Sequence, residues 1–206
     1  SCSEGLHCTC ERAGEEGVTL IGDRRLSPGL TIGYHRDLPG GWGQTVLAHQ
    51  SQVFAVDDAL SDNAAVLLEP LSIALHAVLR TPPRDQEPVL VIGSGTIALA
   101  TIWALRAIDF QGPILAQAKR AHEQELARTL GATDVVAPGP EARQALIETG
   151  ASAYMPVVGP EVYSGGGFPL IYDCVGNRSS IAQTLAFASP RARIVVIGCV
   201  AEFKKL

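Results

Sequence analysis

The ten residues from Val89 to Ala98, VLVIGSGTIA, constrain the fold of this chain more than any other stretch. A short apolar run leads directly into Gly93 and Gly95, and a long apolar-periodic segment follows. This order predicts a strand, a tight turn and a helix. Gly93 would permit the turn, Gly95 would let a pyrophosphate approach the backbone, and Ala98 would let the helix and the strand pack closely. The N–H groups at the start of the helix would then face the phosphates of a dinucleotide. The alternative is a glycine turn in some other α/β unit.

Beyond residue 75 the sequence alternates between strand-like and helix-like patterns. Strands are expected at 89–92, 113–116, 134–137, 170–174 and 193–197, with helices at 96–108, 121–130, 141–149 and 179–188. Residues 151–168, which end in three glycines, are expected to form a loop, either a surface insertion or a mobile flap. Strands that alternate with helices predict an α/β fold with a doubly wound parallel sheet and helices on both faces. The expected strand order is 3-2-1-4-5.

Residues 1–75 have a different pattern, rich in glycine and proline with short apolar runs, which is typical of irregular β structure. We therefore expect two domains, a partial β-rich domain at 1–75 and a dinucleotide-binding domain at 76–206. The chain stops soon after the fifth expected strand, whereas a fold of this kind usually has a sixth. The expectation is therefore a piece of a longer polypeptide that lacks the C-terminal strand.

The composition excludes several classes of protein. With 206 residues, 47% apolar and 18% charged, the chain can bury a sizeable core. A net charge of −5 argues against a nucleic-acid-binding surface. No apolar run reaches the roughly 18 residues of a membrane span, and no signal peptide is visible. Five cysteines, three of them among the first ten residues, do not resemble a secreted disulfide framework. We expect a cytoplasmic protein that binds neither nucleic acid nor membrane.

Several segments together resemble the zinc-dependent medium-chain dehydrogenases of the alcohol, threonine and sorbitol type. They are GGWGQ at 40–44, LEPLSIALHA at 68–77, GSGTI at 93–97, LARTLGA at 126–132 and DCVG at 173–176. The resemblance implies a Rossmann domain preceded by part of a GroES-like domain. It also implies hydride transfer between NAD(P) and a small alcohol or carbonyl substrate, with zinc polarising the substrate oxygen. Members of the family often form homo-oligomers.

The same resemblance assigns cofactor-binding residues. The fingerprint residues Gly93, Gly95, Thr96 and Ile97 would bind the dinucleotide, and Val175 and Ile197 would lie beside its nicotinamide half. Counting back from the LARTLGA segment places the ribose-binding residue at the end of the second strand. NAD enzymes carry an acid there, about 20 residues beyond the glycines.

Gln117 occupies the ribose-binding position and supplies no carboxylate. Lys119 and Arg120 follow directly, and such a cationic pair suits the 2′-phosphate of NADP. The alternative is a solvated basic pair at a helix start. We expect NADP or NAD as the cofactor, with NADP favoured.

The resemblance also implies zinc in the intact protein. Cys2 and Cys10 have the spacing of the last pair of a four-cysteine structural zinc lobe, whose first two cysteines would precede residue 1. The preferred alternative for this chain is free thiols. Glu69 matches the position of a further ligand of the catalytic zinc, whose Cys and His ligands would also lie upstream; otherwise it is a solvated first-turn carboxylate. By itself the chain is expected to bind zinc weakly and to be inactive.

Two other functions stay open at this point. One is a non-catalytic dinucleotide-binding module, which incomplete zinc ligands would allow. The other is an S-adenosylmethionine-dependent methyltransferase, since those enzymes also open with a glycine-rich turn. The Glu69-Pro70 and Gly131-Ala132 segments are not expected in a methyltransferase.

Overall fold

The structure is a computed structural model that divides the chain into two compact units, Ser1–Ala59 and Leu60–Leu206. It describes all of residues 53–199 and, upstream of them, residues 20, 21, 24, 25, 27, 37, 40, 41, 43–46 and 48. The division lies upstream of the boundary expected at residue 75, because helix α2 (Leu68–Arg80) packs against helix α3 (Thr96–Ala107) of the second unit.

In the first unit, the described residues include one short antiparallel pair. Strand β1 (Leu20–Ile21) pairs with β2 (Arg24–Arg25), within a region where the sequence predicts short β structure. The assignment of this part of the chain to a GroES-like domain stays a prediction.

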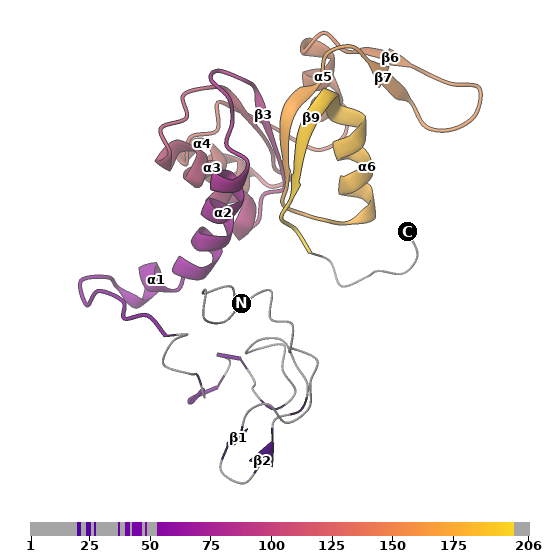
Figure 1. Cartoon of the computed structure of the whole chain (residues 1–206). Coiled ribbons are helices and arrows are strands. Elements are labelled where there is room, and N and C mark those ends of the chain that lie inside the picture. Colours follow the sequence, from indigo (N-terminus) through magenta and orange to yellow (C-terminus); the bar gives the residue numbers. More distant parts are fainter. Residues whose placement is uncertain are drawn as a thin grey trace. The chain divides into compact units, whose positions relative to one another are not determined.

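The second unit is built on a five-stranded sheet (Figure 1). The strands are β3 (Val89–Ile92), β4 (Ile114–Gln117), β5 (Asp134–Val136), β8 (Phe168–Asp173) and β9 (Ala188–Val196). All pairings are parallel and the order is β5-β4-β3-β8-β9. In chain order this is 3-2-1-4-5, so the predicted topology is confirmed. Strand β9 begins at Ala188, earlier than the predicted residue 193, because it follows helix α6 (Arg178–Phe187) without a loop.

Helices cover both faces of the sheet, as predicted. Successive side chains of a strand point to opposite faces, so Val89 and Val91 join a core with helices α2, α3 and α4 (Ala121–Thr129). Leu90 and Ile92 join a second core with α5 (Pro140–Glu148) and α6. Figure 1 shows α2, α3 and α4 on one side of the sheet and α6 on the other. Because both faces of β3 are buried, its carboxyl end is held firmly at the point where the glycine turn begins.

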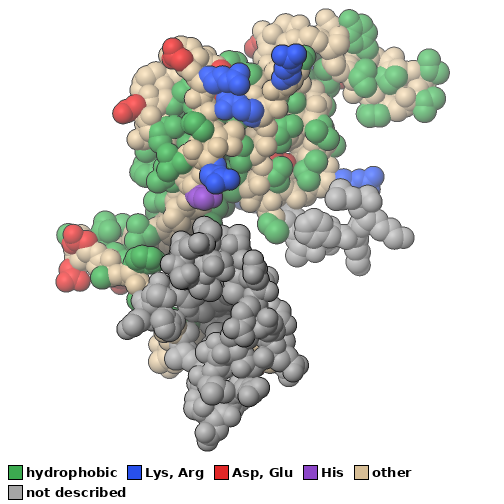
Figure 2. Space-filling model, viewed as in Figure 1, with side chains coloured by type: hydrophobic (Ala, Val, Ile, Leu, Met, Phe, Trp, Pro, Cys, Tyr) green, Lys and Arg blue, Asp and Glu red, His purple; other side chains and the backbone are tan. Residues whose placement is uncertain are grey.

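Residues 151–168 contain more regular structure than the predicted loop. Strands β6 (Ser152–Tyr154) and β7 (Val162–Ser164) form an antiparallel hairpin. The guanidinium of Arg143, in α5, donates two hydrogen bonds to the carboxylate of Glu161, and the hydroxyl of Tyr163 donates a third. The contacts of Arg143 join α5 to the residue directly before β7, which local glycine content could not indicate. Figure 2 shows apolar side chains gathered over the hairpin, whose exposed residues include Met155, Val157 and Val158.

One helical segment does reach the length and apolar character of a membrane span, contrary to the expectation from the sequence. It comprises Asp62–Arg80 and includes the short helix α1 (Asp62–Ala65) and α2. Within the second unit, Ala74 and Val78 of α2 are fully buried in the core that α3 shares. Some of the apolar side chains of this segment are therefore buried inside the second unit.

Candidate functional site

The glycine-rich turn between β3 and α3 has the geometry that the sequence predicts. Gly93 has a φ of +115°, and a Cβ at this position would come within 3.0 Å of Val175 Cγ2. Ala98, in the first turn of α3, is buried below Gly93. Gly93 is therefore required both for its backbone conformation and for the close approach of the β8 loop.

The start of α3 is open. Gly95 is the N-cap residue of the helix, its φ of −77° is ordinary, and a Cβ added to it would meet nothing within 4 Å. Among the described residues, no side chain caps the helix there. The first N–H groups of a helix need partners, and they favour anions. The space above Gly95 is thus suited to a phosphate group.

A pocket of about 300 Å³ lies beside this turn, at the carboxyl ends of the strands. Its lining residues come from the ends of β3 and β4, from the loops after β3, β4, β5 and β8, and from the first two turns of α6. They are Ile92, Gly93, Ser94, Gln117, Lys119, Pro138, Val175, Asn177, Ser179, Ser180 and Gln183. In doubly wound sheets, ligands bind in such crevices where the chain order reverses, which here is between β3 and β8.

Gln117 is the last residue of β4 and lines this pocket. Its side chain is only 3% exposed, and its amide Nε2 has no hydrogen-bond partner among the described residues. A buried amide N–H without a partner is costly, and in native proteins such groups are nearly always satisfied. The structure therefore provides a donor for a ligand acceptor at the position that the sequence assigns to the ribose.

The basic pair is divided between the pocket and its rim. Lys119 lines the pocket, whereas Arg120 is the N-cap residue of α4, with a side chain 73% exposed. Glu123, in the first turn of α4, lies between Arg120 and the glycine turn. Its carboxylate accepts a hydrogen bond of 2.8 Å from Ser94 Oγ, which lowers the pKa of Glu123 below its usual value.

The turn after β8 is organised by a buried carboxylate that sequence reasoning missed. Asp173 is fully buried; its Oδ1 accepts the N–H groups of Val175 and Gly176 at 2.9 and 3.0 Å, and its Oδ2 accepts the hydroxyl of Ser180 at 2.8 Å. Ser180 also forms a reciprocal cap with Asn177 at the start of α6. The signal was present as a strand-terminal acid followed by N-R-S-S, a helix-start pattern.

The structure does not bring Val175 and Ile197 to the same place: the N–H of Ile197 donates to the carbonyl of Asp173 at 2.8 Å, and its side chain packs against the core with α2 and α3, whereas Val175 packs against the core with α5 and α6. Of the two, Val175 lines the pocket. Cys174 lies beside Thr101, and burial raises the pKa of its thiol to about 12. A thiol with that pKa stays protonated near neutrality, so Cys174 is a core residue and not a nucleophile.

Within the described part of the chain, the structure does not place the predicted zinc ligands close to one another. Glu69 is exposed in the first turn of α2, and Cys2 and Cys10 lie outside the described residues. In the described part of the chain, no group of three His, Cys, Asp or Glu residues could hold a metal ion. These residues therefore do not fit a zinc site by themselves, and we derive no step through zinc. The role of Glu69 as a ligand stays a prediction.

A dinucleotide fits the described residues better. The open helix start above Gly95 suits a pyrophosphate, and the unpartnered amide of Gln117 suits a ribose oxygen or a phosphate. Thr96 and Ile97 begin α3 at the edge of this space. Which of these residues contact the cofactor is a prediction of the geometry.

The family of this chain is shown by comparison with known proteins. Residues 96–205, more than half of the chain, match the family model described as zinc-binding dehydrogenase. An uncharacterized zinc-type alcohol dehydrogenase-like protein of Haemophilus influenzae is 32% identical over 81% of this chain and 44% of its own length. The sorbitol dehydrogenase of Bacillus subtilis is 23% identical over 77% of this chain and 41% of its own length. The chain thus spans less than half of the length of these two curated relatives.

Solved structures agree. A protein described as a zinc-binding dehydrogenase of Sinorhizobium meliloti, solved with NADP, has a TM-score of 0.65 and 25% identity, over 96% of this chain and 53% of its own. The alcohol dehydrogenase TADH of Thermus has the same fold, with a TM-score of 0.68 and 21% identity over 97% of this chain and 52% of its own. The parallel sheet, the glycine turn and these matches agree, and the chain belongs to the family of zinc-binding dehydrogenases.

Proposed function

We propose that this chain supplies the dinucleotide-binding part of an oxidoreductase, which transfers hydride between a nicotinamide cofactor and a small alcohol or carbonyl substrate. The observation that carries the proposal is the pocket at the carboxyl ends of β3, β4 and β8, into which the glycine turn and the unpartnered Gln117 amide converge. The zinc-binding dehydrogenase of Sinorhizobium meliloti, solved with NADP, supports the choice of cofactor class.

The residues of this chain bind and orient the cofactor. The first N–H groups of α3 would hold the pyrophosphate, and Gly95 leaves the space that it needs. Val175, fixed by the Asp173 turn, would form one wall beside the ring that carries the hydride. The cofactor supplies the hydride chemistry, and the protein supplies position and exclusion of water.

We propose NADP over NAD as the preferred cofactor. Lys119 lines the pocket and Arg120 lies at its rim, and both can reach toward a 2′-phosphate with charge-assisted hydrogen bonds. The end of β4 itself offers the ribose hydroxyls no carboxylate, because Gln117 is followed directly by the buried Ala118.

Gly95 offers a direct test of the proposal. Its φ is ordinary and its Cβ position is open, so Gly95→Leu should fold normally while placing a side chain in the pyrophosphate space. Isothermal titration calorimetry with NADP⁺ should show binding to the wild type and at least tenfold weaker binding to Gly95→Leu. Ala186→Leu, on the exposed face of α6, introduces a leucine outside the pocket as a control.

Two results would contradict the proposal. One is the absence of NAD⁺ and NADP⁺ binding to a folded wild type. The other is binding of NADP⁺ that Gly95→Leu leaves unchanged. Tight binding of S-adenosylmethionine in place of either dinucleotide would favour a methyltransferase instead.

A further inference from the structure

We propose that Glu123 is a specificity-determining residue, which disfavours NADP relative to NAD by placing a carboxylate between the glycine turn and the basic pair of Lys119 and Arg120. The inference rests on the proposed dinucleotide site and adds to it a residue that opposes the 2′-phosphate. Sequence analysis did not predict this role, because the family pattern places the acid at the end of β4 and not in the first turn of the next helix.

The geometry places this carboxylate at the rim of the pocket. Oε2 of Glu123 accepts hydrogen bonds from Ser94 Oγ at 2.8 Å and from the backbone N–H of Arg120 at 3.2 Å. Oε1 pairs with the guanidinium of Arg120 at 3.2 Å. Ser94 itself lines the pocket, so the carboxylate lies one hydrogen bond from the pocket wall.

The two members of the ion pair differ in their freedom to move. The side chain of Glu123 is 15% exposed and is held by Ser94, whereas that of Arg120 is 73% exposed. Arg120 can therefore swing toward a ligand, but the carboxylate stays in place. Its hydrogen bond with Ser94 also lowers the pKa of Glu123, so that the group remains ionised near neutral pH.

A fixed carboxylate acts on the two cofactors differently. A 2′-phosphate must compete with Glu123 for Arg120, and it is also repelled by the negative charge itself. NAD carries hydroxyl groups there, which can donate hydrogen bonds to a carboxylate. Glu123 should therefore lower the affinity for NADP and leave the affinity for NAD unchanged or slightly higher.

The test is a comparison of cofactor affinities in Glu123→Gln. Glutamine keeps an acceptor for Ser94 Oγ and for the N–H of Arg120, so the start of α4 should be preserved. Calorimetry should show that NADP⁺ binds about five- to tenfold more tightly to this variant than to the wild type, with NAD⁺ changed less than twofold. The gain should shrink when the salt concentration is raised from 0.05 to 0.5 M, because exposed charges are screened.

Glu125→Gln is the matched control. Glu125 is exposed on the same helix, and the substitution removes the same charge two residues away. It should change neither affinity by more than about twofold. Circular dichroism and urea unfolding of both variants would confirm that they are folded.

Two outcomes would overturn the inference. If Glu123→Gln leaves the ratio of the two affinities unchanged, including the case in which it weakens the binding of both cofactors equally, then Glu123 only supports the start of the helix. This result leaves the dinucleotide site intact. If instead the folded wild type binds neither cofactor, the proposed function fails and the inference fails with it.

Discussion

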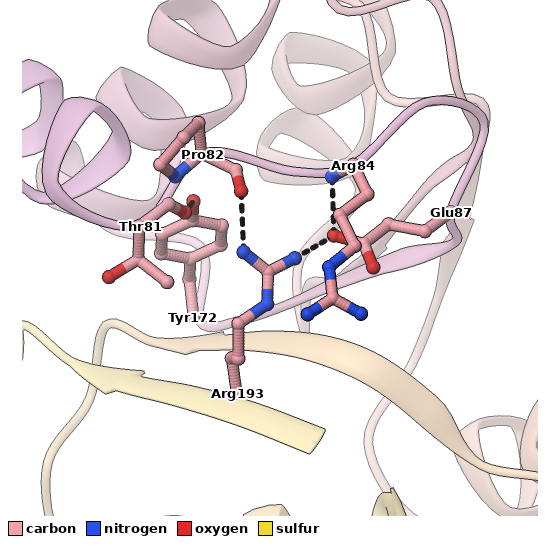
Figure 3. A network of polar contacts seen from close by, with 6 residues as sticks. All are labelled: Thr81, Pro82, Arg84, Glu87, Tyr172 and Arg193. Atoms are coloured by element: carbon pink, nitrogen blue, oxygen red, sulfur yellow. Dashed lines mark hydrogen bonds and ion pairs between the residues drawn. The ribbon is translucent and has the colours of Figure 1, made fainter. Parts of the chain in front are cut away.

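Arg193, in β9, forms an ion pair with Glu87, which precedes β3 and lies 106 residues away in the sequence (Figure 3). The same guanidinium donates a hydrogen bond to the carbonyl of Pro82 at 2.6 Å. The carboxylate of Glu87 also accepts the backbone N–H of Arg84 at 2.6 Å. Beside this network, the hydroxyl of Tyr172 donates to the carbonyl of Thr81 at 2.6 Å. The segment that joins α2 to the sheet is thus fastened to β8 and β9.

We expect Arg193→Met to lower the free energy of unfolding by about 2 kcal/mol, because it leaves the half-buried carboxylate of Glu87 without its cation. Urea unfolding followed by circular dichroism would measure the change. Arg178→Met, at an exposed position in α6, should change stability by less than about 0.5 kcal/mol. Equal losses in both variants would contradict the structural role of the Arg193 pair.

Asp173→Ala should both destabilise the domain and weaken cofactor binding. The buried carboxylate accepts three hydrogen bonds, and its loss leaves Ser180 Oγ and the N–H groups of Val175 and Gly176 without that partner. The expected loss is about 3 kcal/mol in the free energy of unfolding. Thermal unfolding and calorimetry with NADP⁺ would check the two effects. Normal stability of this variant would show that water replaces the carboxylate in the turn.

The pair of Arg143 and Glu161 should make the domain sensitive to acid. Hydrogen bonds from Arg143 and Tyr163 lower the pKa of Glu161 from its usual 4.5 to about 2. Since the folded pKa is depressed, the stabilisation is present above pH 4.5 and is lost as the pH falls toward 2. The difference in urea midpoint between the wild type and Glu161→Gln should therefore be largest above pH 5 and should narrow as the pH falls below 4.5.

Glu125→Gln is the control for this pH effect, because the carboxylate of Glu125 is exposed on α4, an element that contains neither Arg143 nor Glu161. Its difference from the wild type should stay small across the same pH range. If the gap for Glu161→Gln does not narrow on acidification, the ion pair does not contribute to stability in this way.

Arg120→Ala should lower the affinity for NADP⁺ about fivefold while sparing NAD⁺. The reason is the loss of a charge-assisted contact to the 2′-phosphate. Calorimetric titration of both cofactors would measure it, with Arg80→Ala, at the far end of α2, as the control. Equal affinities of the wild type for the two cofactors, unchanged in Arg120→Ala, would show that the basic pair is only a solvated surface.

The local sequence pattern was sufficient to predict the central part of the fold. The strand at Val89–Ile92 was predicted with its exact bounds, because an apolar run that ends at a glycine has few alternative structures. The order of the five strands also followed, since parallel strands joined by single helices allow few topologies. The β6–β7 hairpin was missed because its pairing depends on Glu161 meeting Arg143 from another element.

The sequence by itself determined the glycine turn, the alternation of strands and helices, and the replacement of an acid by Gln117 at the end of β4. Each of these features depends only on residues that are neighbours in the sequence, because local sterics and hydrophobic periodicity indicate their conformation. Only the tertiary structure decided that the amide Nε2 of Gln117 has no partner in the described part of the chain, and that Glu123 is held by Ser94, 29 residues away. Burial and hydrogen bonding between distant segments depend on how the strands and helices pack, and no local pattern encodes that packing.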